Sequence, residues 1–384
     1  MAGERVLMVA GERSGDLLAA ALARDLRARA PDLRLEAMGG AALREAGADI
    51  VVDNRSLAVV GLVEVLRHYP RIRRALKTLE RRLTTHRPDL LVLVDYVEFN
   101  LRLARRAKAL GIPVLFYVSP QVWAWRPGRV HEIGRRIDMM AVIFPFEVDF
   151  YRRHGIPVRY VGNPLPARVR PTLPRDVALA RFGLRADAPV LGLQPGSRRG
   201  EIERLLPTFA ATAARLRAAR PELQLVLPVA AGIEPDFVRR HLPADLPVQL
   251  VTDASPYDVM QVCTAILTAS GTATLETALM QVPMVIAYRV APLSYAILRR
   301  LIRVPHIGLV NIVAQAGIVP EFVQHAATPE RLAAALAPLL DDTPERRAMV
   351  ARLAEVRRRL TDRREAVALD GLVLEMLGRS PDPA

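Results

Sequence analysis

Two kinds of segment alternate along the whole chain. Short apolar runs such as Arg5–Ala10, Leu90–Val94 and residues 190–193 alternate with longer segments whose apolar residues recur at helical spacing. Uninterrupted apolar strands are typical of parallel sheets that are buried on both faces by crossover helices. The pattern therefore predicts an α/β protein built on doubly wound parallel sheets.

The alternation runs through two series. The first has further strands expected at 33–38, 50–52, 114–118, 139–144 and 158–161, and a long helix over 61–83 interrupted near Pro70. Residues 164–189 hold five prolines and no strong strand, which indicates a boundary. Strands are expected again near 223–227, 248–251, 265–267 and 283–287, followed by helices over 329–340, 344–360 and 363–377. We expect two Rossmann-like domains, 1–164 and 189–360, facing a cleft, with a C-terminal helix in 361–384 packing back toward the first.

Two glycine turns follow predicted strands of the second series. Ser270-Gly271-Thr272 separates the strand 264–267 from a helix, whose free amides and positive dipole end suit a phosphate. The other turn contains Gly196, Ser197 and Arg198, and a fixed guanidinium suits a diphosphate bidentately. We expect a nucleotide diphosphate between these turns. The alternative for Arg198 is a solvated surface arginine.

Carboxylates also lie near strand ends, where ligands bind in such sheets. Glu276, one turn into the helix after Thr272, suits ribose hydroxyls, although a surface glutamate that complements the helix dipole is the alternative. Asp95 and Glu98 flank the end of Leu90–Val94, and an acid there is a candidate general base. The alternative is that either residue only caps the helix that begins near Phe99.

Two more turns of the first series carry polar or aromatic side chains. The turn after Arg5–Ala10 holds the polar residues Glu12, Ser14 and Asp16, and helix capping explains only one of these three. The loop 119–126 holds both tryptophans of the chain and an arginine, which could wall a sugar, with packing of the loop as the alternative. The residues expected to meet an acceptor are Glu12, Ser14, Gly15, Asp16, Gln121 and Trp123.

Charge and composition narrow the function. The net charge is +14, but Lys77 and Lys108 are the only lysines, so the excess is arginine spread along the chain. No nucleic-acid-binding motif accompanies it, and we expect no nucleic acid partner. The seven histidines show no ligand spacing and no Asp-x-Asp occurs, so neither a metal site nor a cofactor is expected. The single cysteine, Cys263, excludes an intrachain disulfide.

The chain shows neither a signal peptide nor a membrane-spanning run, which predicts a cytoplasmic protein. Apolar residues flanked by arginines nevertheless fit a surface that rests on an anionic membrane. One such stretch is the start of the helix over 61–83, and another is 295–303. The alternative is that both are ordinary core-facing helices. In the first stretch we expect an exposed patch that receives acyl chains, formed by Leu62, Val63, Val65 and Leu66.

Six segments together resemble the lipid-A-disaccharide synthase family: A-G-E-R-S-G-D at 10–16, V-G-L-V-E-V-L at 60–66, Y-V-S-P-Q-V-W-A-W-R at 117–126, P-G-S-R at 195–198, S-G-T-A-T-L-E at 270–276 and V-P-E at 319–321. The resemblance implies an inverting, metal-independent glycosyltransferase of GT-B architecture. It implies transfer of diacylglucosamine from UDP-2,3-diacylglucosamine to the 6-hydroxyl of 2,3-diacylglucosamine 1-phosphate, with release of UDP. It also implies a protein peripheral to the cytoplasmic face of the inner membrane; whether it forms a homodimer is left open.

The resemblance also distributes roles. It implies that Glu98 is the base and Asp95 an orienting group, that Glu276 holds the ribose and that Asn311 lies at a polar edge of the donor. The diphosphate is expected at Gly196, Ser197, Arg198, Ser270, Gly271, Thr272 and Ala273.

The sequence departs from the family pattern at four places. Glu98 replaces the second acid of Asp-x-Pro-Asp-Phe-Asn, Asn163 a histidine, Val310 a proline and Arg13 a small residue. These departures concern the base and the acceptor pocket, not the donor site. The alternatives are another UDP-sugar enzyme of this fold, such as an epimerase or a different lipid-linked glycosyltransferase, and a catalytically silent UDP-sugar-binding protein.

Overall fold

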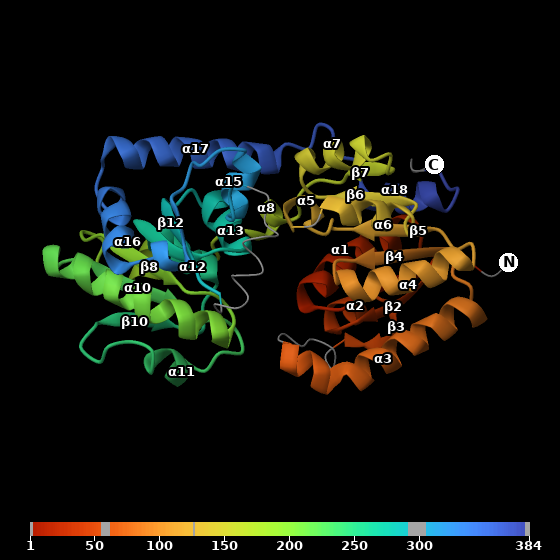
Figure 1. Ribbon diagram of the computed structural model, residues 1–384, viewed down its shortest axis with the longest axis horizontal. Helices are drawn as coiled ribbons and strands as arrows, with labels where there is room; N and C mark the ends of the chain where they lie inside the picture. Colours follow the sequence, from red (N-terminus) through yellow and green to blue (C-terminus); the bar gives the residue numbers. More distant parts are fainter. Residues whose placement is uncertain (1–2, 55–61, 126, 291–304, 381–384) are drawn as a thin grey trace. The chain divides into compact units, whose positions relative to one another are not determined.

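The computed structural model describes residues 3–54, 62–125, 127–290 and 305–380, without the side chains of 62–68, 124, 125 and 127. The chain forms two compact units (Figure 1). Unit 1 comprises Met1–Pro164 and Asp362–Ala384, and unit 2 comprises Leu165–Thr361. Each unit contains one parallel sheet flanked by helices, so the α/β class predicted from the hydrophobic pattern is confirmed.

The sheet of unit 1 has seven strands in the order β3-β2-β1-β4-β5-β6-β7. Chain order reverses between β1 and β4, which makes this pair the topological switch point where ligands bind in such sheets. Every neighbouring pair is parallel. The strands are β1 (Arg5–Ala10), β2 (Arg34–Gly39), β3 (Asp49–Asp53), β4 (Leu90–Val94), β5 (Val114–Tyr117), β6 (Met139–Val142) and β7 (Val158–Tyr160).

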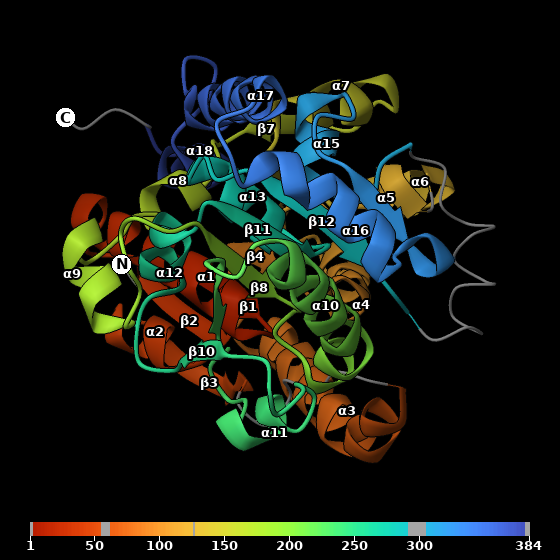
Figure 2. The ribbon, with the colours of Figure 1, turned by 90° about the vertical axis from the view of Figure 1, so that its left-hand side faces the viewer.

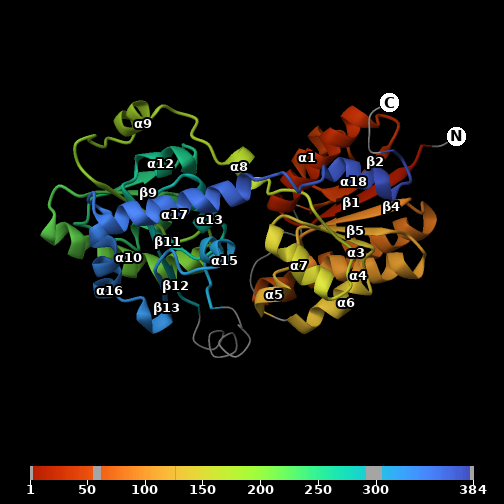
Figure 3. The same ribbon diagram turned by 90° about the horizontal axis from the view of Figure 1, so that it is seen from above.

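Helices cover both faces of this sheet (Figure 3). One core contains side chains of α1, α2 and α18, and the other contains side chains of α3, α4, α6 and α7. These helices, with the short α5, are α1 (Arg13–Arg29), α2 (Ala41–Glu45), α3 (Leu62–Thr85), α4 (Val97–Ala109), α5 (Val122–Trp125), α6 (Val130–Gly134), α7 (Pro145–Arg153) and α18 (Leu369–Met376).

The C-terminal segment is an integral part of unit 1. Leu372, Val373 and Leu374 of α18 are buried in the core that α1 also lines. Arg29 Nη1 of α1 lies 2.7 Å from Asp370 Oδ2. Arg379 pairs with Glu4 and Asp32, next to the first strand and the first helix. Both ends of the chain therefore close the same unit.

Unit 2 repeats the topology with six strands in the order β10-β9-β8-β11-β12-β13. Figure 2 shows α10 beside α16, a pairing that the contacts confirm; α13 packs on α15 and α17. The strands are β8 (Val190–Gln194), β9 (Gln224–Pro228), β10 (Val248–Val251), β11 (Ala265–Ala269), β12 (Met284–Tyr288) and β13 (Glu321–Val323). The helices are α8 (Leu165–Arg168), α9 (Arg175–Arg181), α10 (Arg199–Ala219), α11 (Pro235–Arg239), α12 (Pro256–Val262), α13 (Thr272–Leu279), α15 (Leu309–Ala314), α16 (Pro329–Leu336) and α17 (Pro344–Thr361).

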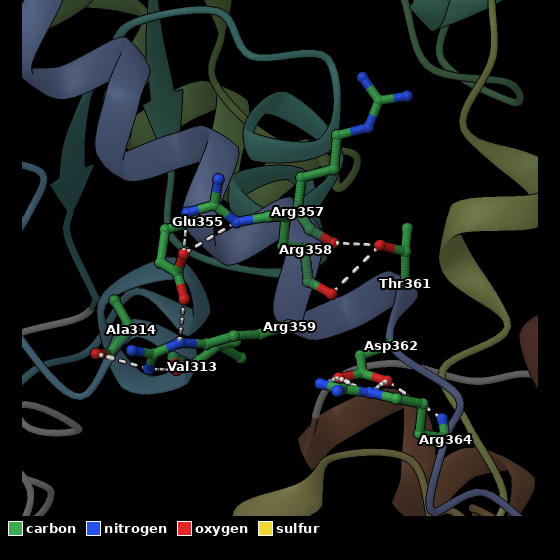
Figure 4. A network of polar contacts seen from close by, with 9 residues as sticks. All are labelled: Val313, Ala314, Glu355, Arg357, Arg358, Arg359, Thr361, Asp362 and Arg364. Carbon is green, nitrogen blue, oxygen red and sulfur yellow. Dashed lines mark hydrogen bonds and ion pairs between the residues drawn. The ribbon is translucent and has the colours of Figure 1, made fainter.

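Polar contacts fix the end of α17 where the chain leaves unit 2 (Figure 4). Glu355 pairs with Arg358 and Arg359. Arg359 Nη1 donates to the carbonyl oxygens of Val313 and Ala314, at 3.2 and 3.1 Å, and so ties α17 to α15. Cations in the last turn also complement the negative end of the helix dipole.

Several predicted elements differ from those observed. Helix α3 continues through Pro70, which is exposed, instead of breaking there. The proline-rich boundary contains α8 and α9, because Pro174 precedes the first turn of α9, where a missing amide costs little. The last helix begins at Leu369 rather than 363. The short edge strand β13 was not predicted.

Within the described ranges, no helix combines the length and the apolar character needed to cross a bilayer.

Candidate active site

The first candidate acid lies on a strained turn at the switch point of unit 1. Asp95 and Tyr96 both have left-handed backbone conformations, with φ of 48° and 44°. The buried amide of Asn100 supports the turn, because its Nδ2 donates to Asp95 O at 2.7 Å and to Val94 O at 3.3 Å. Left-handed non-glycine residues each cost about 1–3 kcal/mol and cluster at functional sites.

Asp95 lies at an apolar pocket of about 650 Å³ between α3 and α4. Burial and the neighbouring Glu12 carboxylate raise the pKa of Asp95, while a hydrogen bond from the Tyr96 amide opposes them. The pocket wall includes Tyr69, Ile72, Leu76, Tyr96, Val97 and Phe99, with charged side chains of both signs. Glycine is required at position 11, because a Cβ there would lie 2.1 Å from the Tyr96 ring. A carboxylate with a raised pKa beside an apolar pocket suits proton abstraction from a bound ligand with an apolar part.

Glu98 also lines this pocket but has a different environment. Its carboxylate forms a bidentate pair with Arg129, with distances of 2.5 Å to Nη1 and 3.2 Å to Nη2. The Glu98 side chain is 74% exposed. Glu98 raises the pKa of Arg129, which stays protonated. The carboxylate of Glu98, to which the resemblance gives the role of base, is therefore already paired with Arg129.

The turn after β1 divides its residues between two roles. Glu12 lines the pocket of Asp95. Asp16 is buried and holds the start of α2, since its carboxylate oxygens accept from the amides of Gly40 at 2.7 Å and Ala42 at 3.1 Å. Ser14 is exposed and Gly15 is buried in the first turn of α1. The sequence grouped these residues as acceptor contacts; the structure gives Asp16 a structural contact, and the acceptor contacts of the group stay a prediction.

The tryptophan loop is anchored on α7. Gln121 is exposed, whereas Trp123 is half-buried and its Nε1 donates to Glu147 Oε1 at 3.1 Å. Trp123 also meets the ring of Phe146 edge-on at 5.2 Å between centroids. Packing of the loop and contact with a sugar, the two alternatives for this loop, are thus compatible, because Trp123 packs on one side and stays accessible on the other.

In unit 2, the turn after β8 binds a carboxylate of the chain itself, that of Glu201. Glu201 Oε2 accepts from the amides of Ser197 at 3.0 Å and Arg198 at 3.2 Å, and Arg198 Nη1 donates to Oε1 at 3.3 Å. Gly196 has φ of 119°, and a Cβ there would lie 2.3 Å from Glu201 Oε2. The donors predicted for a diphosphate therefore bind one carboxylate in this structure, which shows that the turn attracts negative charge.

The second glycine turn leads into α13. Gly271 precedes the helix with φ of 156° and gives no side-chain cap. Thr272 is exposed and Ala273 half-buried, while Ser270 Oγ donates to Ile307 O at 3.0 Å. Since α13 begins without a side-chain cap, its first amides suit an anion.

Glu276 lies in the same helix with a tyrosine partner. Tyr257 Oη donates to Glu276 Oε1 at 3.1 Å. Burial raises the pKa of Glu276, and the Tyr257 hydrogen bond and the charge of Arg168 partly offset this effect. A half-buried carboxylate with one hydroxyl partner can accept further hydroxyl donors, as a ribose would provide.

Asn311 has a mainly structural environment. It is fully buried, and its Oδ1 accepts from the amides of Ile318 and Val319. Its Nδ2 donates to Val319 O at 2.8 Å and Glu321 Oε1 at 2.6 Å. These bonds use the full capacity of a side-chain amide. We therefore assign Asn311 to the support of Glu321, whose carboxylate accepts from the amides of Ile307 and Gly308 just before α15.

Leu62, Val63, Val65 and Leu66 belong to the first turns of α3, but their side chains lie outside the described part of the structure. Residues 295–303 lie outside it altogether. The described residues contain no group of three or more His, Cys, Asp or Glu side chains arranged to hold a metal ion.

The two Rossmann-like units, each with one parallel sheet, place the chain in a fold class that solved glycosyltransferases and UDP-GlcNAc 2-epimerases share. The glycotransferase of kitacinnamycin shares the fold with a TM-score of 0.64 at 19% identity, covering 97% of this chain and 98% of that one. The UDP-GlcNAc 2-epimerase of Neisseria meningitidis, solved with UDP-GlcNAc, has a TM-score of 0.61 at 13% identity, covering 97% and 99%.

Sequence relatives specify the family. The profile described as Lipid-A-disaccharide synthetase matches residues 6–371. Lipid-A-disaccharide synthase of Geobacter sulfurreducens is 50% identical over 375 residues, covering 98% of both chains. The enzyme of the same description from Nitrosococcus oceani is 48% identical over 356 residues, covering 92% of both. The chain belongs to the lipid-A-disaccharide synthase family, as its motifs predicted.

Four residues at or near these turns escaped the sequence reasoning: Arg129, Glu147, Glu201 and Tyr257. Glu147 and Glu201 had a local signal, because a glutamate three residues after a helix cap is typical of a capping box. The others come from elements distant in sequence from the groups they contact, so spacing could not reveal them.

Proposed function

We propose that this chain transfers diacylglucosamine from UDP-2,3-diacylglucosamine to the 6-hydroxyl of 2,3-diacylglucosamine 1-phosphate. The product is the β-1,6-linked disaccharide 1-phosphate of lipid A, and UDP is released. Family membership supports this reaction. The observation that carries it in the geometry is Asp95, an acid with a raised pKa on a strained turn beside an apolar pocket, as an acylated acceptor requires.

We assign the proton transfer to Asp95. Its carboxylate takes the proton of the acceptor 6-hydroxyl as that oxygen attacks C1 of the donor sugar. The bond between C1 and the diphosphate oxygen breaks, and its electron pair leaves with UDP, so the configuration at C1 inverts. The sequence favoured Glu98 for this role, but the pairing of Glu98 with Arg129 suits a residue that shapes the pocket.

Unit 2 supplies the donor site in this proposal. Arg198 and the first amides of α13 stabilise the negative charge that gathers on the diphosphate, and Glu276 binds the ribose. Glu201 already shows that the Ser197 and Arg198 amides bind an anionic oxygen. The diphosphate therefore either shares these donors with Glu201 or displaces it.

The test is incubation of the purified chain with UDP-diacylglucosamine and diacylglucosamine 1-phosphate, with detection by mass. A disaccharide 1-phosphate and one equivalent of UDP are expected. A changed monosaccharide would instead show an epimerase, an activity named among the structural neighbours. UDP binding without turnover would show a silent binding protein.

We further propose that α3 brings the protein to an anionic membrane surface. Tyr69 is 49% exposed, and Arg71, Arg73, Arg74 and Lys77 are exposed on the same helix. Exposed aromatic and basic side chains on one helix favour the headgroup region of anionic lipid. Leu62, Val63, Val65 and Leu66 would extend this surface toward the N-terminus of α3.

A further inference from the structure

A buried polar cluster lies behind the tryptophan loop of unit 1, and the reaction steps above do not use it. Glu147, in the first turn of α7, is 1% exposed. Its Oε1 accepts from Trp123 Nε1 at 3.1 Å and its Oε2 from the Phe144 amide at 3.2 Å. The Ser119 hydroxyl also lies near this carboxylate; it donates to the carbonyl oxygen of Pro120 at 2.9 Å and lies 2.8 Å from Tyr151 Oη.

The surroundings of Glu147 balance its two protonation states. Its hydrogen-bond partners are an indole, two backbone amides and a hydroxyl, all neutral donors that favour the ionised carboxylate. Burial opposes them and raises the pKa of Glu147 to about 7. Tyr151, the other titratable group beside it, stays protonated because burial and the Glu147 charge raise its pKa.

These contacts fix the loop from the side of α7. Trp123 is held between the Glu147 carboxylate and the ring of Phe146, which itself stacks on Phe144 at 5.6 Å between centroids. Ser119, at the other end of the loop, meets the same carboxylate. Glu147 of α7 therefore binds Trp123 directly and lies next to Ser119, and these two loop residues lie on either side of the exposed Gln121 in the sequence.

We propose that Glu147 is a positioning residue that fixes Trp123, and with it the loop 119–125, for contact with the acceptor sugar. The contact with the sugar rests on the proposed function; the anchoring of the loop does not. When Glu147 is protonated, one of its oxygens becomes a donor, and the neutral group accepts from the indole and the amide more weakly than the carboxylate does. The loop is then held less firmly, so acceptor binding weakens as the pH falls through neutrality.

The anchoring is tested by fluorescence, because the chain has two tryptophans. In a Trp125→Phe background, Trp123 is the only indole and reports the charge beside it. Its emission should change with pH around a midpoint near 7, as the pKa of Glu147 requires. The change should vanish in Glu147→Gln and persist in Asp149→Asn, which removes an exposed acid from the same helix. If the emission of Trp123 changed with pH in Glu147→Gln as it does in the wild type, the proposed anchoring by Glu147 would be wrong.

The functional part is tested with the full chain and both acyl-sugar substrates. Glu147→Gln should lower kcat/KM for the acceptor by roughly 10- to 100-fold, the scale of a lost hydrogen bond to a charged group, with donor KM unchanged. Trp123→Phe keeps the Glu147 carboxylate and an aromatic ring, although a smaller one, but removes the indole N–H. The double variant should be no worse than the more damaging of the two single variants, because Glu147 acts through Trp123. If the losses of the two single variants multiplied in the double variant, or if KM for the donor rose as much as KM for the acceptor, Glu147 would not be a positioning residue for the acceptor. If the wild type forms no disaccharide, the proposed function fails while the fluorescence result stands.

Discussion

Replacement of Asp95 by asparagine is the sharpest test of the proposed chemistry. The substitution keeps the shape of the side chain and its hydrogen bond from the Tyr96 amide, so the strained turn should be preserved. It removes only the capacity to take a proton. The matched change is Glu98→Gln, which alters the other acid that lines the same pocket.

The expected losses differ by orders of magnitude. General-base catalysis contributes about 10²- to 10⁴-fold, so Asp95→Asn should lower kcat by that factor. The Glu98 side chain is 74% exposed, and its replacement by glutamine removes only the ion pair with Arg129. Exposed pairs contribute about 0–1 kcal/mol, so Glu98→Gln should change kcat less than about tenfold.

The assay is UDP release at saturating donor and acceptor, with UDP affinity measured separately by calorimetry. Both variants should bind UDP as the wild type does, because the substitutions lie in unit 1. The pH profile provides a second readout. The pKa of Asp95 is raised, so the wild-type rate should fall, as the pH decreases, at a higher pH than an ordinary aspartate would give. Asp95→Asn should lack this acidic limb.

An active Asp95→Asn with an inactive Glu98→Gln would refute the reasoning and return the base to Glu98, as the sequence suggested. Similar losses in both variants would show that the two acids work as one unit.

Three further predictions concern the donor, the membrane and stability. Arg198→Ala should slow turnover by roughly 10²- to 10³-fold, as for one lost oxyanion donor; near-normal rates would remove Arg198 from the site. Binding to anionic vesicles should weaken steeply with salt, and Val65→Asp with Leu66→Asp should abolish it; a double variant that co-sediments and turns over normally would disprove the membrane surface. Arg82 makes two 2.7 Å bonds to Glu36 and lowers its pKa, so Arg82→Ala should cost about 1–3 kcal/mol in urea unfolding. Because the folded pKa of Glu36 is lowered, the difference should persist at neutral pH and shrink as the pH falls below the usual glutamate value; equal stability would contradict the pairing.

The hydrophobic pattern predicted most of the fold because parallel strands and crossover helices have distinct periods. The strand Arg5–Ala10 and the strand Leu90–Val94 were predicted with their observed bounds. Edge elements were harder. Strand β13 has three half-buried residues, so it lacks the apolar run that marks a central strand.

Strand ends indicated where polar residues collect, but not which partner each would find. The sequence placed Asn311 at the donor, whereas buried carbonyl and amide groups from 318–321 use its side chain. Likewise, spacing could not separate Asp95 from Glu98, because the difference between them depends on Arg129, thirty-one positions from Glu98. Burial and long-range ion pairs decide these roles, and neither has a local signature.

The discontinuity of unit 1 has a consequence for synthesis. Its first 164 residues emerge from the ribosome before any of unit 2, yet its last piece, from Asp362 onward, emerges after all of it. Leu372, Val373 and Leu374 complete a core that α1 leaves open, so unit 2 can finish folding while unit 1 still exposes apolar surface. The usual order, in which the N-terminal domain completes its fold first during synthesis, is therefore not open to unit 1. Until α18 is made, the core of unit 1 lacks the side chains of Leu372, Val373 and Leu374, and a chain cut before Leu369 would leave that core incomplete.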